Sequence, residues 1–257
     1  PQRTVMPRGF PSPIGSHSPH HVGRESRLCL AGPVTTPIER FIDVNGVRLR
    51  VLEAGPPDGP TVILAHGFPE LAYSWRHQIP TLAAAGYHVL APDQRGYGGS
   101  TRPATIESYD IVALTGDLIG LLDAVGAERG AFVGHDWGAV LAWSTPLLHP
   151  DRVVAVAGLS MPPLPRPRTP PTEAFRRIFG DNFFYMLYFQ QAGVADAELA
   201  ADPHRSMRRM LGGMRAPQDE SAALRMLDPG KQGFIDRLPE PDLLPDWLSA
   251  AELDHYV

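Results

Sequence analysis

Apolar residues occur along this chain in two kinds of pattern, one typical of strands and one typical of helices. Residues 39–44 and 47–54 alternate apolar and polar side chains on either side of Asn45-Gly46, a dipeptide that favours a two-residue hairpin turn. Short, continuously apolar runs follow, each with the length of a strand that is covered on both faces. These runs are 61–65, 87–91, 129–133 and 153–159.

Helical spacing of apolar residues separates these runs. One helix is predicted to begin at a cap formed by Ser108 and to run to Val125, with a single stripe of apolar side chains. Another is predicted to end near Gly86, and a third to start after Gly138. Strands that alternate with helices predict a mostly parallel sheet with helices on both faces, and ligands bind such sheets beyond the C-terminal strand ends.

The pattern changes at both ends of this region. Residues 1–33 are rich in Pro, Arg, Ser, His and Gly and show no periodicity, which predicts disorder. After Ser160, residues 161–171 contain six prolines, and the following residues are mostly helical or irregular in pattern. We therefore divide the chain into a disordered extension (1–35), a core (36–159) and an inserted helical cap (160–257) that shields the strand ends from water.

Composition narrows the class of protein. The 257 residues are 43% apolar and 20% charged, as in a soluble globular protein, and the net charge of −5 gives no reason to expect nucleic acid as a partner. No apolar run is long enough to span a membrane. The single cysteine, Cys29, excludes an internal disulfide and suits a reducing compartment, so we expect the protein to be cytoplasmic.

The pentapeptide Gly134-His135-Asp136-Trp137-Gly138 stands between a predicted strand and a predicted helix. Strand, sharp turn and helix are the context of a nucleophile elbow, in which glycines allow a tight turn and a close approach of the helix to the strand. Asp136 is then exposed at the C-terminal edge of the sheet, beside the positive end of the helix. An ordinary capping aspartate in a glycine-rich turn is the alternative interpretation of these five residues.

An aspartate at the elbow determines the chemistry. A serine that attacked an alkyl carbon would leave an ether, whereas a carboxylate leaves an ester that water can cleave. Asp136 therefore predicts displacement at carbon followed by ester hydrolysis. The glycine-rich loop 93–100 lacks the Gly-Lys-Ser/Thr of a phosphate-binding loop, and we expect neither a cofactor nor a metal.

From about residue 36 to residue 257, the chain resembles the epoxide hydrolases of the α/β-hydrolase fold, the actinobacterial ones in particular. His66-Gly67-Phe68-Pro69 and loop 93–100 match motifs shared by much of the superfamily, while the aspartate elbow restricts the choice to epoxide hydrolases and dehalogenases. Residues 185–190 (Tyr-Met-Leu-Tyr-Phe-Gln) resemble the cap motif of epoxide hydrolases. The resemblance implies the α/β-hydrolase fold and conversion of a small apolar epoxide, with water, to a vicinal diol through an alkyl-enzyme ester.

Roles for single residues follow from this resemblance. Asp136 would be the nucleophile, and the phenol of Tyr185 would donate to the epoxide oxygen as the C–O bond breaks. The backbone N–H groups of Phe68 and Trp137 would form the oxyanion hole. Phe68, Trp137, Tyr185 and Gln190 would bind the substrate.

Two details of this assignment rest on the motif match alone. Spacing does not select Tyr185 over Tyr188, and a core position is the alternative for Tyr185. The resemblance also implies a cis bond before Pro69.

A homodimer is a further expectation for this protein.

Dehalogenases of the same fold are the main functional alternative. Haloalkane dehalogenases usually carry Asn or Glu at the position of Phe68, and fluoroacetate dehalogenases usually carry Arg at the position of Trp137. Together with Tyr185, these residues favour epoxide opening. A hydrolase-fold protein that binds a ligand without chemistry is a second alternative, against which the presence of Asp136 and Tyr185 argues.

The family also implies groups that this chain lacks. A second cap tyrosine, the last core strands, the acid and the histidine base would all follow Val257, so we expect a fragment that does not turn over alone. Among the histidines present, His149 is expected about 20 Å from Asp136, at the far end of a helix. His66 is assigned a structural hydrogen bond and His135 is expected to point away from the site. We assign no base.

Overall fold

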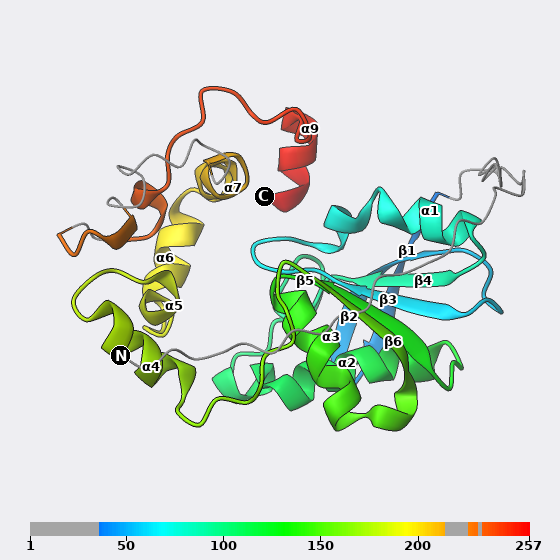
Figure 1. Cartoon of the computed structure of the whole chain (residues 1–257). Helices are drawn as coiled ribbons and strands as arrows, with labels where there is room; N and C mark the ends of the chain where they lie inside the picture. The colour runs from blue at the N-terminus through cyan, green and yellow to red at the C-terminus, as the bar shows by residue number, and fades with distance from the viewer. Residues whose placement is uncertain (1–35, 214–225, 231–232) are drawn as a thin grey trace, which may run out of the picture. The chain divides into compact units, whose positions relative to one another are not determined.

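The structure is a computed structural model that describes residues 36–213, 226–230 and 233–257. The predicted extension 1–35 and part of the predicted cap lie outside the described residues. A six-stranded sheet, in the order β1-β2-β4-β3-β5-β6, carries the first part of the described chain (Figure 1). Its strands are β1 (Ile38–Val44), β2 (Val47–Ala54), β3 (Thr61–Ala65), β4 (His88–Pro92), β5 (Gly130–His135) and β6 (Val153–Leu159).

Both hairpin and parallel pairings follow the predicted pattern. Strands β1 and β2 pair antiparallel around Asn45 and Gly46, whose φ angles of 47° and 75° fit the predicted two-residue turn. Strand β2 pairs antiparallel with β4, whereas the β3–β4, β3–β5 and β5–β6 pairings are parallel. The predicted α/β-hydrolase architecture, a mostly parallel sheet with an antiparallel hairpin at one edge, is confirmed.

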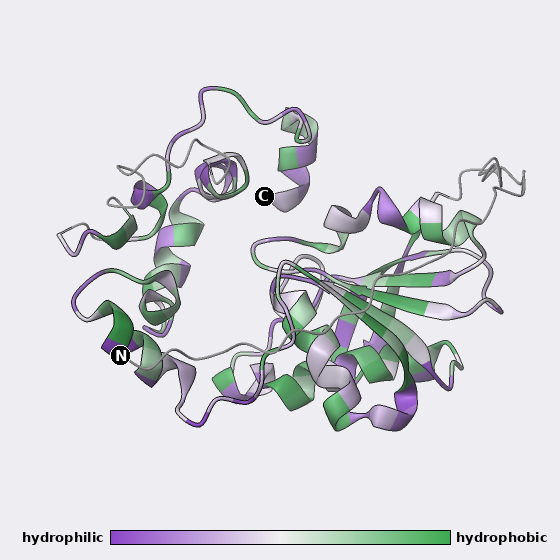
Figure 2. Ribbon diagram, viewed as in Figure 1, coloured by the Kyte–Doolittle hydropathy of each residue, from purple (hydrophilic) through white to green (hydrophobic). Residues whose placement is uncertain are grey.

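Helices cover both faces of the sheet (Figure 1). Helix α1 (Gln78–Ala84) packs on one face, while α2 (Ile111–Ala124) and α3 (Trp137–Leu148) pack on the other. Successive residues of a strand serve opposite faces: Val62 and Leu64 join the α1 cluster, and Ile63 joins the α2–α3 cluster. All five residues of β3 are buried, which explains its continuous apolar run, coloured green in Figure 2.

Two predictions about the core are wrong in detail. Ser108 does not cap α2; it lies in the short 3₁₀ helix η2 (Ile106–Tyr109), and the carboxylate of Asp110 accepts the N–H of Ala113 at 2.7 Å. Asp110 is the capping residue because it immediately precedes the helix and has the extended backbone angles of an N-cap. Strand β6 is not buried, since Val154 is 66% exposed and only β5 pairs with it in the described sheet.

Residues after the sheet are helical or irregular, and no strand occurs among those that the structure describes. Their main apolar cluster contains Met207, Met210, Phe234, Ile235 and Leu238. None of the described helices has the length and apolar character that crossing a membrane requires. The elements of this region are α4 (Pro171–Phe179), α5 (Tyr185–Tyr188), α6 (Val194–Ala201), α7 (Pro203–Met207), the π-helix η4 (Arg208–Gly212), η5 (Ile235–Arg237), α9 (Ala250–Leu253) and η6 (Asp254–Tyr256), while η1 (Ala72–Trp75) and η3 (Pro150–Arg152) belong to the sheet region.

The end of the helical region contacts the sheet region at η1. The guanidinium of Arg76 donates to Glu252 at 2.8 Å, and the hydroxyls of Ser74 and Tyr256 lie 3.0 Å apart. The ring of His255 stacks on Tyr73 with 4.1 Å between ring centroids. These contacts hold the two regions together at a point distant in sequence from residues 160–170, which connect them.

Candidate active site

Asp136 occupies the sharp turn between β5 and α3. Its φ of 53° lies in the left-handed region that non-glycine residues rarely adopt. The backbone compensates for this strain, because the Asp136 N–H donates to the Leu159 carbonyl at 3.2 Å and the Asp136 carbonyl accepts the Ala139 N–H at 3.0 Å. The turn therefore holds one carboxylate at the C-terminal edge of the parallel strands.

Two glycines of the pentapeptide are required by close backbone contacts. A Cβ added to Gly134 would overlap the carbonyl of Gly138, and one added to Gly138 would overlap the carbonyl of Ala65. Helix α3 thus starts directly against the ends of β3 and β5. This geometry explains the glycine spacing around Asp136 that the sequence revealed.

A loop after β3 lies against the carboxylate. The Phe68 N–H donates to the Asp136 Oδ1 at 3.1 Å, and a Cβ on Gly67 would stand 2.5 Å from the Asp136 Cβ. The peptide bond between Phe68 and Pro69 is cis, as predicted. One predicted backbone donor therefore points at the predicted nucleophile, and Trp137, the other, begins α3 immediately after it.

Glu70 is a charged group of this site that the sequence analysis missed. Its carboxylate lies 2.9 Å from the His135 Nδ1 and links the loop after β3 to the residue before Asp136. The hydrogen bond to Glu70 raises the pKa of His135. Burial opposes the charge of Glu70, but the hydrogen bond from His135 lowers its pKa overall. Glu70 follows the recognised His-Gly-Phe-Pro motif directly, which was the available signal.

No histidine in the described ranges forms a hydrogen bond with Asp136. His66 is fully buried; its Nδ1 faces the Gly67 carbonyl at 2.8 Å and its Nε2 accepts the Gln94 N–H at 3.0 Å. Burial lowers the pKa of His66, which keeps the ring neutral. His149 follows the last residue of α3, at the end opposite Asp136, as predicted.

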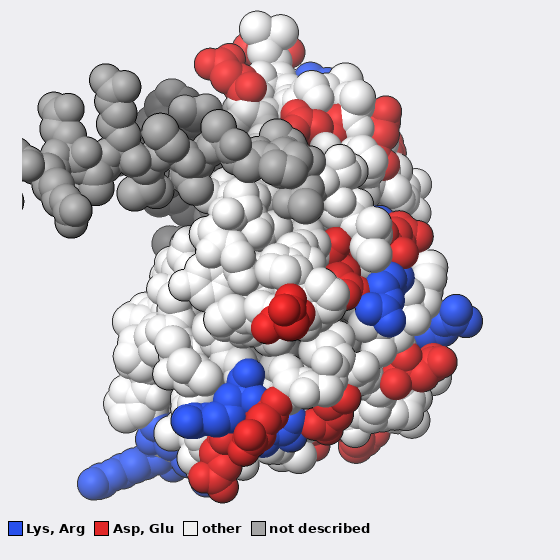
Figure 3. Space-filling view, turned by 90° about the vertical axis from the view of Figure 1, so that its right-hand side faces the viewer, with Lys and Arg blue, Asp and Glu red and all other residues white. Residues whose placement is uncertain are grey.

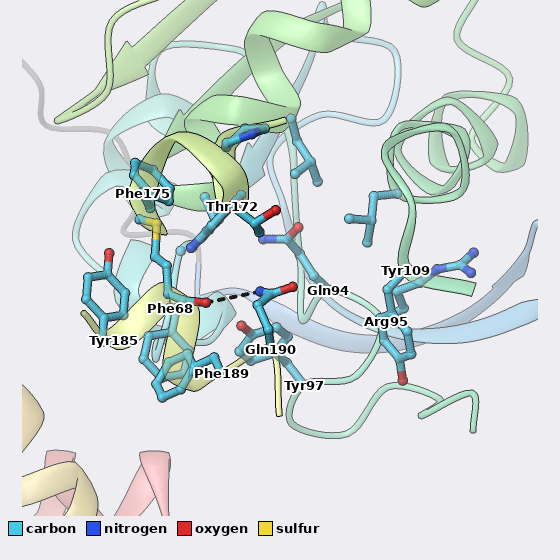
Figure 4. A pocket seen from close by; sticks show the side chains of 16 residues that line it. Phe68, Gln94, Arg95, Tyr97, Tyr109, Thr172, Phe175, Tyr185, Phe189 and Gln190 are labelled. Carbon is cyan, nitrogen blue, oxygen red and sulfur yellow. Dashed lines mark hydrogen bonds between the residues drawn. The ribbon is translucent and has the colours of Figure 1, made fainter. Parts of the chain in front are cut away.

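Two adjoining cavities meet at this site. The larger, of about 550 Å³, and the smaller, of about 150 Å³, share Phe68, Trp137 and Tyr185 in their walls. Asp136 lines the smaller cavity, together with Met210 and other apolar residues of the helical region. Figure 4 shows the side chains around the larger cavity. A molecule bound at the three shared residues therefore has space on both sides, one cavity on each.

Tyr185 and Tyr188 have different surroundings, although both lie on α5. Tyr185 lines both cavities, and burial together with the charge of Asp136 raises its pKa. The Tyr188 hydroxyl donates to Glu198 at 2.8 Å and does not line either of these cavities. The geometry thus separates two tyrosines that spacing did not distinguish.

The remaining predicted binding residues also reach the larger cavity. Trp137 is 48% exposed, and its side chain lies at the junction with the smaller cavity. Gln190 lines the larger cavity, with its side-chain amide donating to the Met186 carbonyl at 3.1 Å. The sequence analysis did not anticipate Tyr97 or Phe175 in this wall, because no local pattern indicates which loop residues face a cavity.

A parallel sheet with a sharp strand-to-helix turn, flanked by backbone donors, defines an α/β-hydrolase whose elbow residue is a carboxylate. The family model for the alpha/beta hydrolase fold matches residues 60–241. Epoxide hydrolase A of Mycobacterium tuberculosis is 72% identical over 86% of this chain, and epoxide hydrolase 3 of Siraitia grosvenorii is 42% identical over 84%. The chain belongs to the epoxide hydrolases of the α/β-hydrolase fold.

Solved structures agree with this assignment. The crystal structure of epoxide hydrolase A from Mycobacterium thermoresistibile has a TM-score of 0.83 and 68% identity, and covers 86% of this chain. An epoxide hydrolase from an endophytic Streptomyces has a TM-score of 0.81 and 41% identity over the same share. The chain spans 69% of the Mycobacterium tuberculosis relative and 66% of the Siraitia one, and the corresponding shares of the two solved chains are also 69% and 66%.

Proposed function

We propose that Asp136 is the nucleophile of an epoxide hydrolase reaction that proceeds through an alkyl-enzyme ester. The observation that carries this proposal is the contact of 3.1 Å between the Phe68 N–H and the Asp136 Oδ1 at the elbow. Because Oδ1 is already bonded to a donor, Oδ2 is the oxygen that attacks the epoxide carbon. A new C–O bond forms to Oδ2, and the ring C–O bond breaks with its electron pair on the epoxide oxygen.

Tyr185 is proposed to give its phenolic proton to that oxygen. Its pKa, raised by burial and by the charge of Asp136, keeps the phenol protonated until the alkoxide develops. Tyr185 lines both cavities and therefore reaches the region where Asp136 is accessible. Phe68, Trp137 and Gln190 are proposed to contact the substrate around it.

Ester hydrolysis is the second step. Water adds to the carbonyl carbon of the Asp136 ester, and negative charge develops on Oδ1, where the Phe68 N–H already points. The Trp137 N–H, at the first residue of α3, is proposed as the second donor. Collapse of the tetrahedral intermediate releases the diol and restores the carboxylate. Of the two protons of the water, one ends on the former Oδ2, which leaves in the diol, and the other restores the phenol of Tyr185. We assign the activation of this water to no histidine of the described residues.

A single turnover in ¹⁸O-water by the protein that carries this chain tests the covalent route. The epoxide oxygen stays in the diol, and the second diol oxygen comes from Asp136, so the label is expected in Asp136 after one turnover. Label in the first-turnover diol would mean that water attacks the ring directly. Haloalkanes should release no halide under the same conditions, which distinguishes this reaction from dehalogenation.

We propose an extension over 1–35, a core over 36–159 and a cap over 160–257, supported by the confinement of the described strands to residues 38–159. A cytoplasmic location is supported by the single cysteine, Cys29, which suits a reducing compartment. The absence of a nucleic-acid or membrane partner is supported by the net charge of −5 and by the mixture of acidic and basic side chains on the face in Figure 3. A homodimer is testable by light scattering.

A further inference from the structure

The larger cavity contains polar atoms that the proposed reaction does not use. The Tyr97 hydroxyl and the side-chain oxygens of Gln94 and Gln190 have no hydrogen-bond partner in the part of the chain that the structure describes, and all three residues line this cavity. By contrast, Tyr109 donates its hydroxyl to the Pro103 carbonyl at 2.8 Å, and Arg95 is bonded to Asp117 at 2.6 Å. Unused polar groups in a mostly apolar wall indicate a specific ligand group.

Both amides have fixed orientations. The Gln94 Nε2 donates to the His66 carbonyl, and the Gln190 Nε2 donates to the Met186 carbonyl at 3.1 Å. A carbonyl only accepts, so one N–H of each amide is used by the backbone, while each amide keeps its oxygen as an acceptor and its second N–H as a donor. Figure 4 shows Gln94, Gln190 and Tyr97 grouped near the middle of the view. The two amide oxygens therefore have fixed positions, because a flip of either amide would lose its bond to the backbone.

Tyr97 is held on a rigid turn. Its N–H donates to the Gln94 carbonyl at 2.9 Å, so the two side chains leave the same turn. Its ring meets the buried ring of His66 edge to face, with centroids 4.9 Å apart. Burial and the charge of Asp136 raise the pKa of Tyr97 to about 12, so the phenol is a neutral donor at physiological pH.

We propose that Tyr97, Gln94 and Gln190 form a subsite for a hydroxyl group on the longer arm of the epoxide substrate. An alcohol donates and accepts at one atom: it can accept from Tyr97 and donate to an amide oxygen. A carboxylate only accepts, so it would leave both amide oxygens without a donor, while a hydrocarbon would leave all three groups unpaired. The inference rests on the proposed function, which puts the epoxide ring at Asp136 and Tyr185, beside the residues that the two cavities share.

The size of the cavities supports the assignment of the arms. The smaller cavity, of about 150 Å³, is lined by Met210 and Phe234 and suits a short apolar substituent. The larger, of about 550 Å³, has room for a longer chain that carries the hydroxyl group. The expected substrate class is thus a neutral hydroxy epoxide with two unequal arms.

A matched pair of alkyl epoxides tests the subsite in the protein that carries this chain. One has a terminal hydroxyl and the other a methyl group in its place, over a series of chain lengths. The ratio of their kcat/KM values, alcohol over methyl, should exceed one at one chain length. Tyr97→Phe should lower that ratio by up to about tenfold, which corresponds to the upper end of the range for one neutral hydrogen bond. Gln190→Met should also lower the ratio.

Tyr109→Phe is the matched control, because its hydroxyl is already bonded to Pro103 and should leave the ratio at the parent value. The proposal is overturned if the parent prefers the alcohol at no chain length, or if Tyr97→Phe and Gln190→Met change both substrates equally. Should Tyr97→Phe fail to fold, Gln190→Met decides alone. Failure of the proposed function would look different: neither epoxide would alkylate Asp136.

Discussion

The sheet region and the helical region hold their functional groups by different means. In the sheet region, backbone geometry fixes them: Asp136 is set by a turn with φ of 53°, and the Phe68 N–H is set by a loop pressed against it. In the helical region, side chains replace regular backbone pairing. The Glu198 carboxylate accepts from the Phe234 N–H at 2.8 Å, the Ile235 N–H at 2.9 Å and the Tyr188 hydroxyl at 2.8 Å.

Arg237 extends this contrast. It is 1% exposed, donates to the carbonyls of Gly233 and Asp228 at 2.7 Å each, and lies over the Phe183 ring with 3.6 Å to the centroid. A carboxylate and a guanidinium thus organise the irregular segments around η5. At the elbow the positions of atoms depend on glycines that no other residue can replace, whereas around η5 they depend on two charged side chains.

Removal of the nucleophile gives the largest expected effect. Asp136→Asn keeps the size of the side chain and tolerates the positive φ, but its amide is a poor nucleophile. Epoxide turnover by the protein that carries this chain should fall by about 10⁴-fold or more, with an unchanged thermal unfolding temperature. Activity within about tenfold of the parent would refute the assignment, because the turn would then hold a carboxylate that takes no part in the reaction.

Glycine substitutions compare the two regions in stability. Gly138→Ala should lower the free energy of unfolding by about 3 kcal/mol, because the new Cβ would overlap the Ala65 carbonyl. Gly193→Ala, before α6, has open space around the new Cβ and a φ of 79°, so the loss should be about 1 kcal/mol. Urea unfolding measures both. Equal losses of unfolding free energy in the two variants would show that Gly138 at the elbow is packed no more tightly than Gly193 in the helical region.

The same contrast explains how much of the structure could be predicted from the sequence. Strand β3 and strand β6 have the predicted bounds because apolar runs report the sheet directly. Asp136 was predicted for a similar reason, since two glycines at fixed offsets are the local signature of its turn. The apolar run of β6 did not indicate its exposure, because such a run does not reveal how many neighbours a strand has.

Side chains that meet across long sequence distances could not be predicted. Glu70 meets His135, and Tyr97 reaches a cavity that also contains Phe175, yet no periodicity relates these positions. The motif match selected Tyr185 over Tyr188, but the partner of the Tyr188 hydroxyl, Glu198, became visible only in the structure. Local patterns determine secondary structure, and only the packed fold determines which loop residues share a site.

Tyrosine substitutions give a smaller effect and test the division within α5. Tyr185→Phe should slow alkylation of Asp136 by about 10²-fold, because the epoxide oxygen would leave without its proton donor. Tyr188→Phe should leave alkylation near the parent rate and instead cost about 1 kcal/mol of stability through the lost bond to Glu198. Stopped-flow alkylation and thermal unfolding separate the two. If Tyr185→Phe reacts like the parent, Tyr185 is a packing residue.

The pair of His135 and Glu70 gives the smallest expected effect and a pH dependence. The hydrogen bond to Glu70 raises the pKa of His135 above 6.5, so stability from its charge is present below 6.5 and is lost as the pH rises through the raised value. Burial opposes the charge of Glu70, but the bond from His135 lowers its pKa below 4.5, so its contribution is present above 4.5 and is lost as the pH falls through the lowered value.

The coupling between the two side chains should therefore be largest between pH 4.5 and 6.5 and decline on both sides. It should stay below about 1 kcal/mol, because the side chains are 36% and 22% exposed and water screens them. A double-mutant cycle of His135→Gln and Glu70→Gln, followed by urea unfolding across pH, measures it. Repeated with Asp136→Asn, the cycle should lose its coupling at a lower pH on the high-pH side, since the charge of Asp136 also raises the pKa of His135. A coupling that does not vary with pH would mean that a neutral hydrogen bond, rather than charge, joins the loop after β3 to the elbow.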